Sequence, residues 1–176
     1  MFVNKRLVLA LVLVLGFVGV SAAQDDAPRC YTLASLSGTY GVVAEYGAHQ
    51  AMALAVRHFD GKGNTNGTFT VNAPDPASTT GGRKLITGTN VGTYTINCDG
   101  TGVITRVLTS STGVVTTQMD DFVITTATVK NGVLVATTME DAVRVPSALV
   151  PGGVFVTRHY TRRPDGGGSD GDQNQQ

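Results

Sequence analysis

The chain has 176 residues, and its 13 basic and 13 acidic side chains balance to a formal net charge of zero. This balance leaves no basic surplus to attract nucleic acid, so we expect no nucleic-acid partner. Apolar residues make up 41% of the chain and charged residues only 15%, a composition that can build a buried core.

The chain begins with the features of a secretory signal peptide. Lys5 and Arg6 precede an unbroken apolar run, and Ser21 and Ala23 supply the small residues expected before a cleavage site. The run is too short to span a bilayer comfortably as a helix. We therefore expect residues 1–23 to be a signal peptide, and the protein to be secreted or periplasmic and not integral to a membrane.

The next segment, 24–36, is interpreted as an N-terminal arm that carries Cys30. The only other cysteine of the chain is Cys98. Export to an oxidising compartment predicts a disulfide bond between Cys30 and Cys98. Two unpaired, buried thiols are the alternative.

Beyond the arm, short alternating runs rich in Thr and Val predict strands, because β-branched residues suit a pleated sheet. Turn residues such as Asp60-Gly61 and Asn131-Gly132 separate the runs and indicate antiparallel hairpins. Gly88 and Gly92 predict a bend or bulge in the fourth strand. The expected strands are 37–45, 50–59, 67–72, 84–97, 102–109, 114–125, 133–138 and 154–162.

Two segments interrupt this hairpin pattern, and a polar tail follows the last strand. Residues 73–83 form a polar loop. The connection 140–153 contains apolar residues that must pack on something, so it is expected to cover one end of a barrel or to hold a short helical turn. The composition of 164–176 predicts a disordered tail.

Eight short strands within 37–163 favour an all-β domain, a single antiparallel eight-stranded up-and-down barrel. Closure of the barrel removes the exposed edges of a sheet. Such a barrel has room for packed side chains or one small ligand. A sandwich of two sheets is the alternative, because the sequence does not fix closure.

Four segments of the chain resemble a group of small secreted bacterial proteins. These segments are 36–40 (LSGTY), 59–64 (FDGKGN), 92–102 (GTYTINCDGTG) and 121–124 (DFVI). The resemblance implies a lipocalin-like, calycin-type barrel. Because the shared motifs are turns and strand starts, the resemblance implies a fold and no particular chemistry.

The sequence predicts no catalytic residues, no metal site and no cofactor. The three histidines, His49, His58 and His159, form no metal-binding pair in the sequence. Asp120 and Asp121 are adjacent in a strand, so their side chains point to opposite faces and cannot converge on one substrate. Asp121 is expected either to point inward beside other polar groups or to be solvated.

Inward-facing polar residues are the remaining candidates for a site. If they face the interior, four residues could line a pocket that orients the anionic group of an apolar ligand: Tyr40, Arg57, Arg158 and Tyr160. The alternative is that both arginines face solvent or pair with Glu45 and Asp121, since the facing of each strand is not fixed by sequence.

These features favour a non-catalytic, secreted β-barrel that binds a small apolar or amphipathic molecule. One alternative is an enzyme of the cyclase or isomerase type that uses the barrel cavity. The other is a solid-core structural or surface-interaction module. Both faces of the strand 50–59 are largely apolar, and its outer face could pack against a loop or against another subunit in a homo-oligomer.

Overall fold

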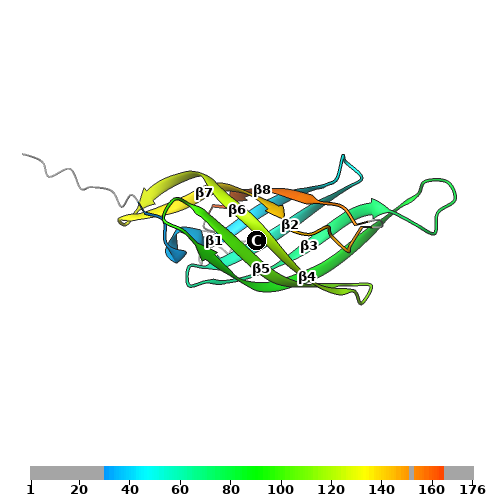
Figure 1. Cartoon of the computed structure of the whole chain (residues 1–176), viewed down its shortest axis with the longest axis horizontal. Coiled ribbons are helices and arrows are strands. Elements are labelled where there is room, and N and C mark those ends of the chain that lie inside the picture. Colours follow the sequence, from blue (N-terminus) through cyan, green and yellow to red (C-terminus); the bar gives the residue numbers. More distant parts are fainter. Residues whose placement is uncertain (1–29, 151–152, 165–176) are drawn as a thin grey trace, which may run out of the picture.

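The computed structural model describes residues 30–150 and 153–164, and these form one closed antiparallel barrel (Figure 1). Each strand pairs with its neighbours in chain order, and β1 also pairs with β8, which closes the sheet. The predicted all-β, eight-stranded up-and-down barrel is therefore confirmed. The strands are β1 (Ser37–Tyr46), β2 (Ala51–Asp60), β3 (Asn64–Pro74), β4 (Arg83–Ile96), β5 (Thr101–Ser110), β6 (Val115–Lys130), β7 (Val133–Val143) and β8 (Val156–Arg162).

Some sequence predictions fall on parts of the chain that are not described. The signal peptide, 1–23, and residues 24–29 of the N-terminal arm, 24–36, lie outside the described residues, as does nearly all of the tail, 164–176. These segments stay predictions.

The predicted strands agree with the observed ones except for β3, β6 and β7, which are all longer than predicted. The connection expected to begin at residue 140 begins after Val143, because β7 continues its alternation through Met139 and Asp141, both buried. Asp141 is a charged residue at an inward position, so it interrupts the apolar pattern. The pattern therefore predicted that the strand ends earlier than it does. The polar loop between β3 and β4 is shorter than 73–83, because the strands extend into it at both ends.

The turn residues between β6 and β7 were predicted correctly, but the strand with an irregular register was not. Asn131 and Gly132 both have positive φ, 52° and 75°, as a two-residue hairpin turn requires. Of the bend or bulge predicted in β4, the bulge is wrong, because the pairing of β4 with β3 and β5 runs without interruption. The register shifts in β6 instead, between Ile124 and Ala127.

Gly92 has a packing role that explains its place in β4. A Cβ atom there would lie 2.1 Å from the Thr105 carbonyl oxygen and 2.7 Å from Arg106 Cα. Only glycine therefore fits beside the inward-facing stem of Arg106.

The barrel interior contains two apolar clusters, one toward each end. The first cluster is Ala44, Tyr46, Ala51, Ala53, Phe69, Val71, Ala73, Ile86, Leu108, Val143, Leu149, Val150 and Val156. The second is Leu36, Tyr40, Val42, Phe59, Tyr94, Ile104, Phe122, Ile124, Ala136, Met139 and Tyr160. In the second cluster the ring of Phe59 packs edge-on against the rings of Tyr40 and Tyr94.

Short segments cover both ends of the barrel. At one end lies the 3-10 helix η1 (Leu33–Leu36), whose Leu36 is fully buried and whose Leu33 carbonyl accepts a hydrogen bond from the Tyr94 hydroxyl at 2.8 Å. At the other end the connection between β7 and β8 places Leu149 and Val150 in the first cluster. Of the two arrangements expected for this connection, the structure shows the one that covers a barrel end.

The predicted disulfide bond joins Cys30 to Cys98 in the turn between β4 and β5. The backbone N–H of Tyr31 donates to the Cys98 carbonyl at 3.1 Å, which fixes the chain just before η1. The bond therefore holds the covering helix at its end of the barrel.

Replacing both cysteines with serine is expected to lower the free energy of unfolding by about 4 kcal/mol, because the bond closes a loop with a sequence separation of 68 residues. Urea unfolding with and without a reducing agent measures the effect. The double serine variant is the control, since a reducing agent should not shift its midpoint. An unchanged midpoint for the reduced wild type would contradict the prediction.

Candidate functional site

A layer of buried polar side chains crosses the barrel interior between the two apolar clusters. We call it the polar layer, and it consists of Arg57, Asn90, Arg106, Gln118, Asp120, Asp141, Arg158 and Tyr160, all almost fully buried. Strand alternation places each of them inside, since their neighbours along each strand face outward. Burial of five charged groups is costly unless they are paired, so the pairing decides what this layer can do.

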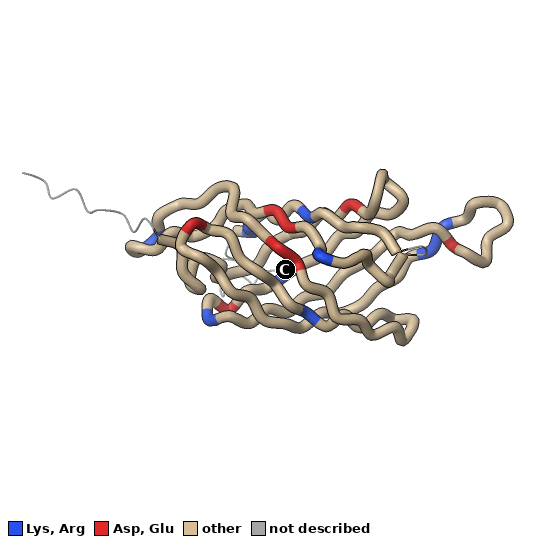
Figure 2. The backbone as a smooth tube through the Cα atoms, in the orientation of Figure 1, with Lys and Arg blue, Asp and Glu red and all other residues tan. Residues whose placement is uncertain are grey.

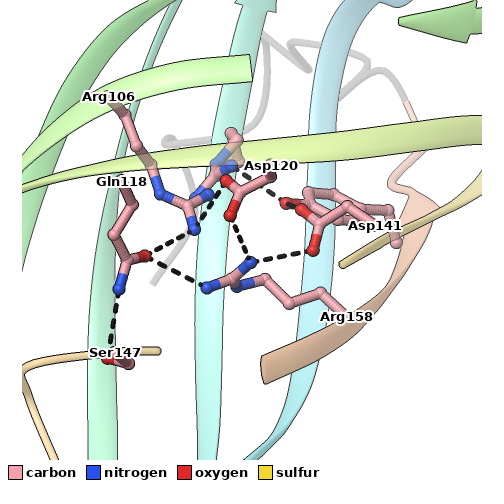
Figure 3. Close-up of polar contacts among 8 residues, drawn as sticks. Arg106, Gln118, Asp120, Asp141, Ser147 and Arg158 are labelled. Atoms are coloured by element: carbon pink, nitrogen blue, oxygen red, sulfur yellow. Dashed lines mark hydrogen bonds and ion pairs between the residues drawn. The ribbon is translucent and has the colours of Figure 1, made fainter. Parts of the chain in front are cut away.

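Arg158 lies at the centre of the pairing. Its Nη1 donates to Asp120 Oδ1 at 3.1 Å and to Asp141 Oδ1 at 2.8 Å. Figure 3 shows the Arg158 guanidinium between these two carboxylates. Arg158 is thus held by an ion pair on each side and is the best-compensated cation of the polar layer.

Arg106 is tied to the same carboxylate from the opposite side. Its Nη2 forms an ion pair with Asp120 Oδ2 at 2.9 Å, but the angles of this contact fall outside hydrogen-bond geometry. The same nitrogen donates a hydrogen bond to Gln118 Oε1 at 2.9 Å. Gln118 Oε1 also accepts from Arg158 at 3.2 Å, and Gln118 Nε2 donates to Ser147 at 3.1 Å (Figure 3). Gln118 therefore links both arginines to the connection that covers the barrel end.

Arg57 meets a hydroxyl rather than a carboxylate. Its Nη1 donates to the Tyr160 hydroxyl at 2.9 Å, and its guanidinium lies 5.5 Å from the centre of the Tyr160 ring. The Tyr160 hydroxyl in turn donates to Asp141 Oδ2. Tyr160 thus connects Arg57 to Asp141 through two hydrogen bonds, and Arg57 and Asp141 form no direct ion pair.

The polar layer has more positive than negative groups, and some of its atoms have no partner. Three guanidinium groups face two carboxylates, which leaves one formal positive charge in excess. Among the described residues, the buried atoms without a hydrogen-bond partner include Arg57 Nε, Arg106 Nε, Arg106 Nη1 and Asn90 Oδ1. Such atoms are rare in protein interiors, where buried polar groups are nearly always hydrogen-bonded.

The electrostatic environment gives the polar layer fixed charges at neutral pH. Burial, together with the guanidinium groups of Arg57 and Arg158, lowers the pKa of Arg106 to about 10. Burial alone would lower the pKa of Arg158, but the carboxylates of Asp141 and Asp120 more than offset it and raise that pKa. Burial raises the pKa of Tyr160 to about 12. These arginines therefore stay protonated and Tyr160 stays neutral near pH 7, an arrangement suited to holding a charge rather than to moving a proton.

The structure places all four predicted ligand residues inside the barrel. Arg57, Arg158 and Tyr160 belong to the polar layer, and Tyr40 lies in the second apolar cluster, where its hydroxyl donates to the Ala136 carbonyl at 2.8 Å. Their role in binding stays a prediction.

The alternative prediction was that Arg57 and Arg158 face solvent or pair with Glu45 and Asp121. It is wrong, because both arginines are buried while Glu45 and Asp121 lie on the outer wall. Asp121 forms an exposed ion pair with Arg144 at 2.6 Å, and the exposed carboxylate of Glu45 lies 3.7 Å from His49. Of the adjacent aspartates it is Asp120 that points inward. The predicted opposite facing of this pair is thus confirmed, while the inward option for Asp121 is not.

Sequence reasoning missed Asn90, Arg106, Gln118, Asp120 and Asp141 as members of the interior. A signal was present, since Arg106 sits between the buried Ile104 and Leu108 at a spacing of two. The apolar residues of β5 therefore already assigned Arg106 to the inner face.

The described part of the chain contains no group of three or more His, Cys, Asp or Glu side chains placed to bind a metal ion. His58 and His159 are exposed on the outer wall, where His159 lies 3.6 Å from Glu140. Within residues 30–150 and 153–164, no helix has the length and hydropathy that crossing a bilayer requires.

No family model, curated protein or solved structure matches the chain. The fold and the polar layer place this protein in the class of eight-stranded up-and-down barrels with a charged interior. The resemblance to calycin-type proteins stays a prediction.

Asp120→Asn is expected to lower the free energy of unfolding by about 3–5 kcal/mol, because it removes the carboxylate that Arg106 and Arg158 share. Asp121→Asn is the matched control, since the neighbouring side chain is exposed on the outer wall and its loss should change stability little. Urea unfolding monitored by circular dichroism compares the two variants. Similar losses in both would refute the assignment of Asp120 as the buried partner.

Proposed function

We propose that this protein is a non-catalytic binding protein that acts outside the cytoplasm and takes a small apolar or amphipathic molecule into its barrel. Tyr40, Arg57, Arg158 and Tyr160 are the proposed ligand-facing residues. The predicted signal peptide and the disulfide bond both support an oxidising, extracytoplasmic location.

The observation that carries this proposal is the incomplete pairing of the polar layer. A barrel that served only as a structural unit would be most stable with an apolar interior, because buried charges cost several kcal/mol each even when partly paired. Here the interior keeps three arginines, and buried N–H groups of two of them have no partner among the described residues. A bound molecule that supplies hydrogen-bond acceptors would account for these groups.

The apolar clusters on either side of the polar layer suit the rest of such a molecule. Ligand sites are usually lined by apolar and aromatic side chains with a few placed polar groups that set orientation. Ala55 packs against both clusters and precedes Arg57 by two residues on the same inner face of β2. Because this small side chain contacts both clusters, we place the apolar part of the ligand beside Ala55.

The charge states of the polar layer favour binding over catalysis of the cyclase or isomerase type. Acid–base catalysis works best with a group that titrates near the working pH. Arg106 and Tyr160 instead have pKa values of about 10 and about 12, far from neutral.

Native mass spectrometry of the purified protein, together with titration of a dansyl-labelled fatty acid, tests the proposal. We expect a co-purified small molecule or saturable binding of the probe. Ala55→Leu should weaken probe binding by about tenfold because it fills the interior. Val56→Leu is the matched control on the outer wall and should bind normally. A clean apo mass and no saturable binding would refute the proposed function.

A second candidate function, surface association, is supported by the outer wall of β2 and β4. The exposed apolar side chains there are Met52, Leu54, Val56, Leu85 and Val91. Two surface hollows of about 550 and 340 Å³ lie on this wall beside Leu54, and no charged residue lines either of them. Figure 2 likewise shows long stretches of the backbone without charged positions. Two copies could bury these side chains against each other without placing like charges in contact.

Size-exclusion chromatography with light scattering at several concentrations tests this association. Leu54→Glu should shift the protein toward monomer, because the new carboxylate would be buried in the interface. Val115→Glu is the control, since Val115 is also exposed but lies on β6. A monomer at every concentration for the unmodified protein would refute surface association between copies.

A further inference from the structure

Arg57 is the guanidinium of the polar layer whose charge is left without a counter-ion. It is only 3% exposed, and among the described residues no carboxylate forms an ion pair with it. Its Nη1 donates to the neutral hydroxyl of Tyr160, and its Nε has no partner among the described residues. A buried, unpaired cation is one of the most costly groups in a protein interior.

Arg106 presents further unused donors close to Arg57. It is 1% exposed, and both Nε and Nη1 have no partner among the described residues, because Asp120 and Gln118 engage only Nη2. Burial and, next, the charge of Arg57 lower the pKa of Arg106, as expected where two guanidinium groups share one interior. Two like charges held close together in a low-dielectric interior call for an anion between them.

The register of the sheet relates the two arginines to Asn90. Arg57 pairs with Gly67 on β3, and Gly67 pairs with Asn90 on β4, so the three lie in one row across the wall. Gly92, two residues beyond Asn90, pairs with Arg106 on β5. Gly67 and Gly92 carry no side chain, and the backbone of β2 lies close to Gly67 as that of β5 does to Gly92. Asn90 is therefore the polar side chain that the register places between Arg57 and Arg106.

We propose that a single negative charge, that of a carboxylate or a halide ion, binds inside the barrel between Arg57 and Arg106, beside Asn90. One negative charge balances the excess positive charge of the polar layer, whereas a dianion would reverse it. Water could accept hydrogen bonds from the unused N–H groups but could not compensate the charge. The anion could be a free ion or the anionic group of the ligand, and the second case rests on the proposed function.

Thermal unfolding in increasing chloride or acetate, at constant ionic strength, tests the anion site. The wild type should gain melting temperature with the logarithm of anion concentration, as expected when the folded state binds an ion. Arg57→Met removes the excess charge, and Asn90→Asp supplies a carboxylate from the chain itself, so both variants should lose this dependence. Arg83→Met, which removes an exposed arginine, is the control and should respond as the wild type does.

Two further measurements do not depend on the folding of any variant. A wild-type crystal soaked in bromide should show an anomalous peak in contact with Arg57 and Arg106. The dansyl-labelled fatty acid should also bind the wild type at least about tenfold more tightly than the corresponding dansyl-labelled alcohol.

The outcomes separate this inference from the proposed function. A response to chloride and acetate without binding of either amphiphile supports a free anion and contradicts the proposed function. A preference for the acid over the alcohol, lost in Arg57→Met, supports a ligand-borne anion. Equal binding of acid and alcohol, with no bromide peak and no difference between wild type and Arg57→Met in salt, overturns the anion site while leaving ligand binding intact.

Discussion

The ion pairs of Arg158 with Asp120 and Asp141 are the interaction on which the barrel interior depends. They join β6, β7 and β8, the part of the sheet that closes onto β1. Because both carboxylates are also shared, with Arg106 and with Tyr160, the loss of one group would leave others buried and unpaired. The charged groups of the polar layer thus form one network, in which Arg57 is the charged member without an ion pair to a carboxylate among the described residues.

The segments that cover the two barrel ends are tied to the same interior by different means. At one end the disulfide bond and the Tyr94 hydroxyl hold η1 in place. At the other end the connection between β7 and β8 contributes Leu149 and Val150 to the first apolar cluster and Ser147 to the polar layer through Gln118. A molecule that entered at this second end would have to separate packing contacts and hydrogen bonds such as that of Ser147 with Gln118, but not the disulfide bond.

Functional residues were harder to predict than strands because the two rest on different signals. Strand positions follow from local alternation and turn residues such as Asn131 and Gly132, which act within a few residues. The partners of Arg158 lie 17 and 38 residues away along the chain, on β7 and β6. Nothing local distinguishes Asp120, which is buried, from Asp121, which pairs with Arg144 in solvent.

The sequence by itself determined the strands, the turns and the partner of each cysteine, since β-branched alternation and glycine placement act locally and only one disulfide pairing exists for two cysteines. The tertiary structure decided which face of each strand is inside and which charges meet there. Barrel closure determines both the inner face of each strand and the charges that meet inside. The register between β1 and β8 brings strands that are far apart in the sequence around one interior. Coulomb interactions across that layer depend on distances that only the closed sheet defines.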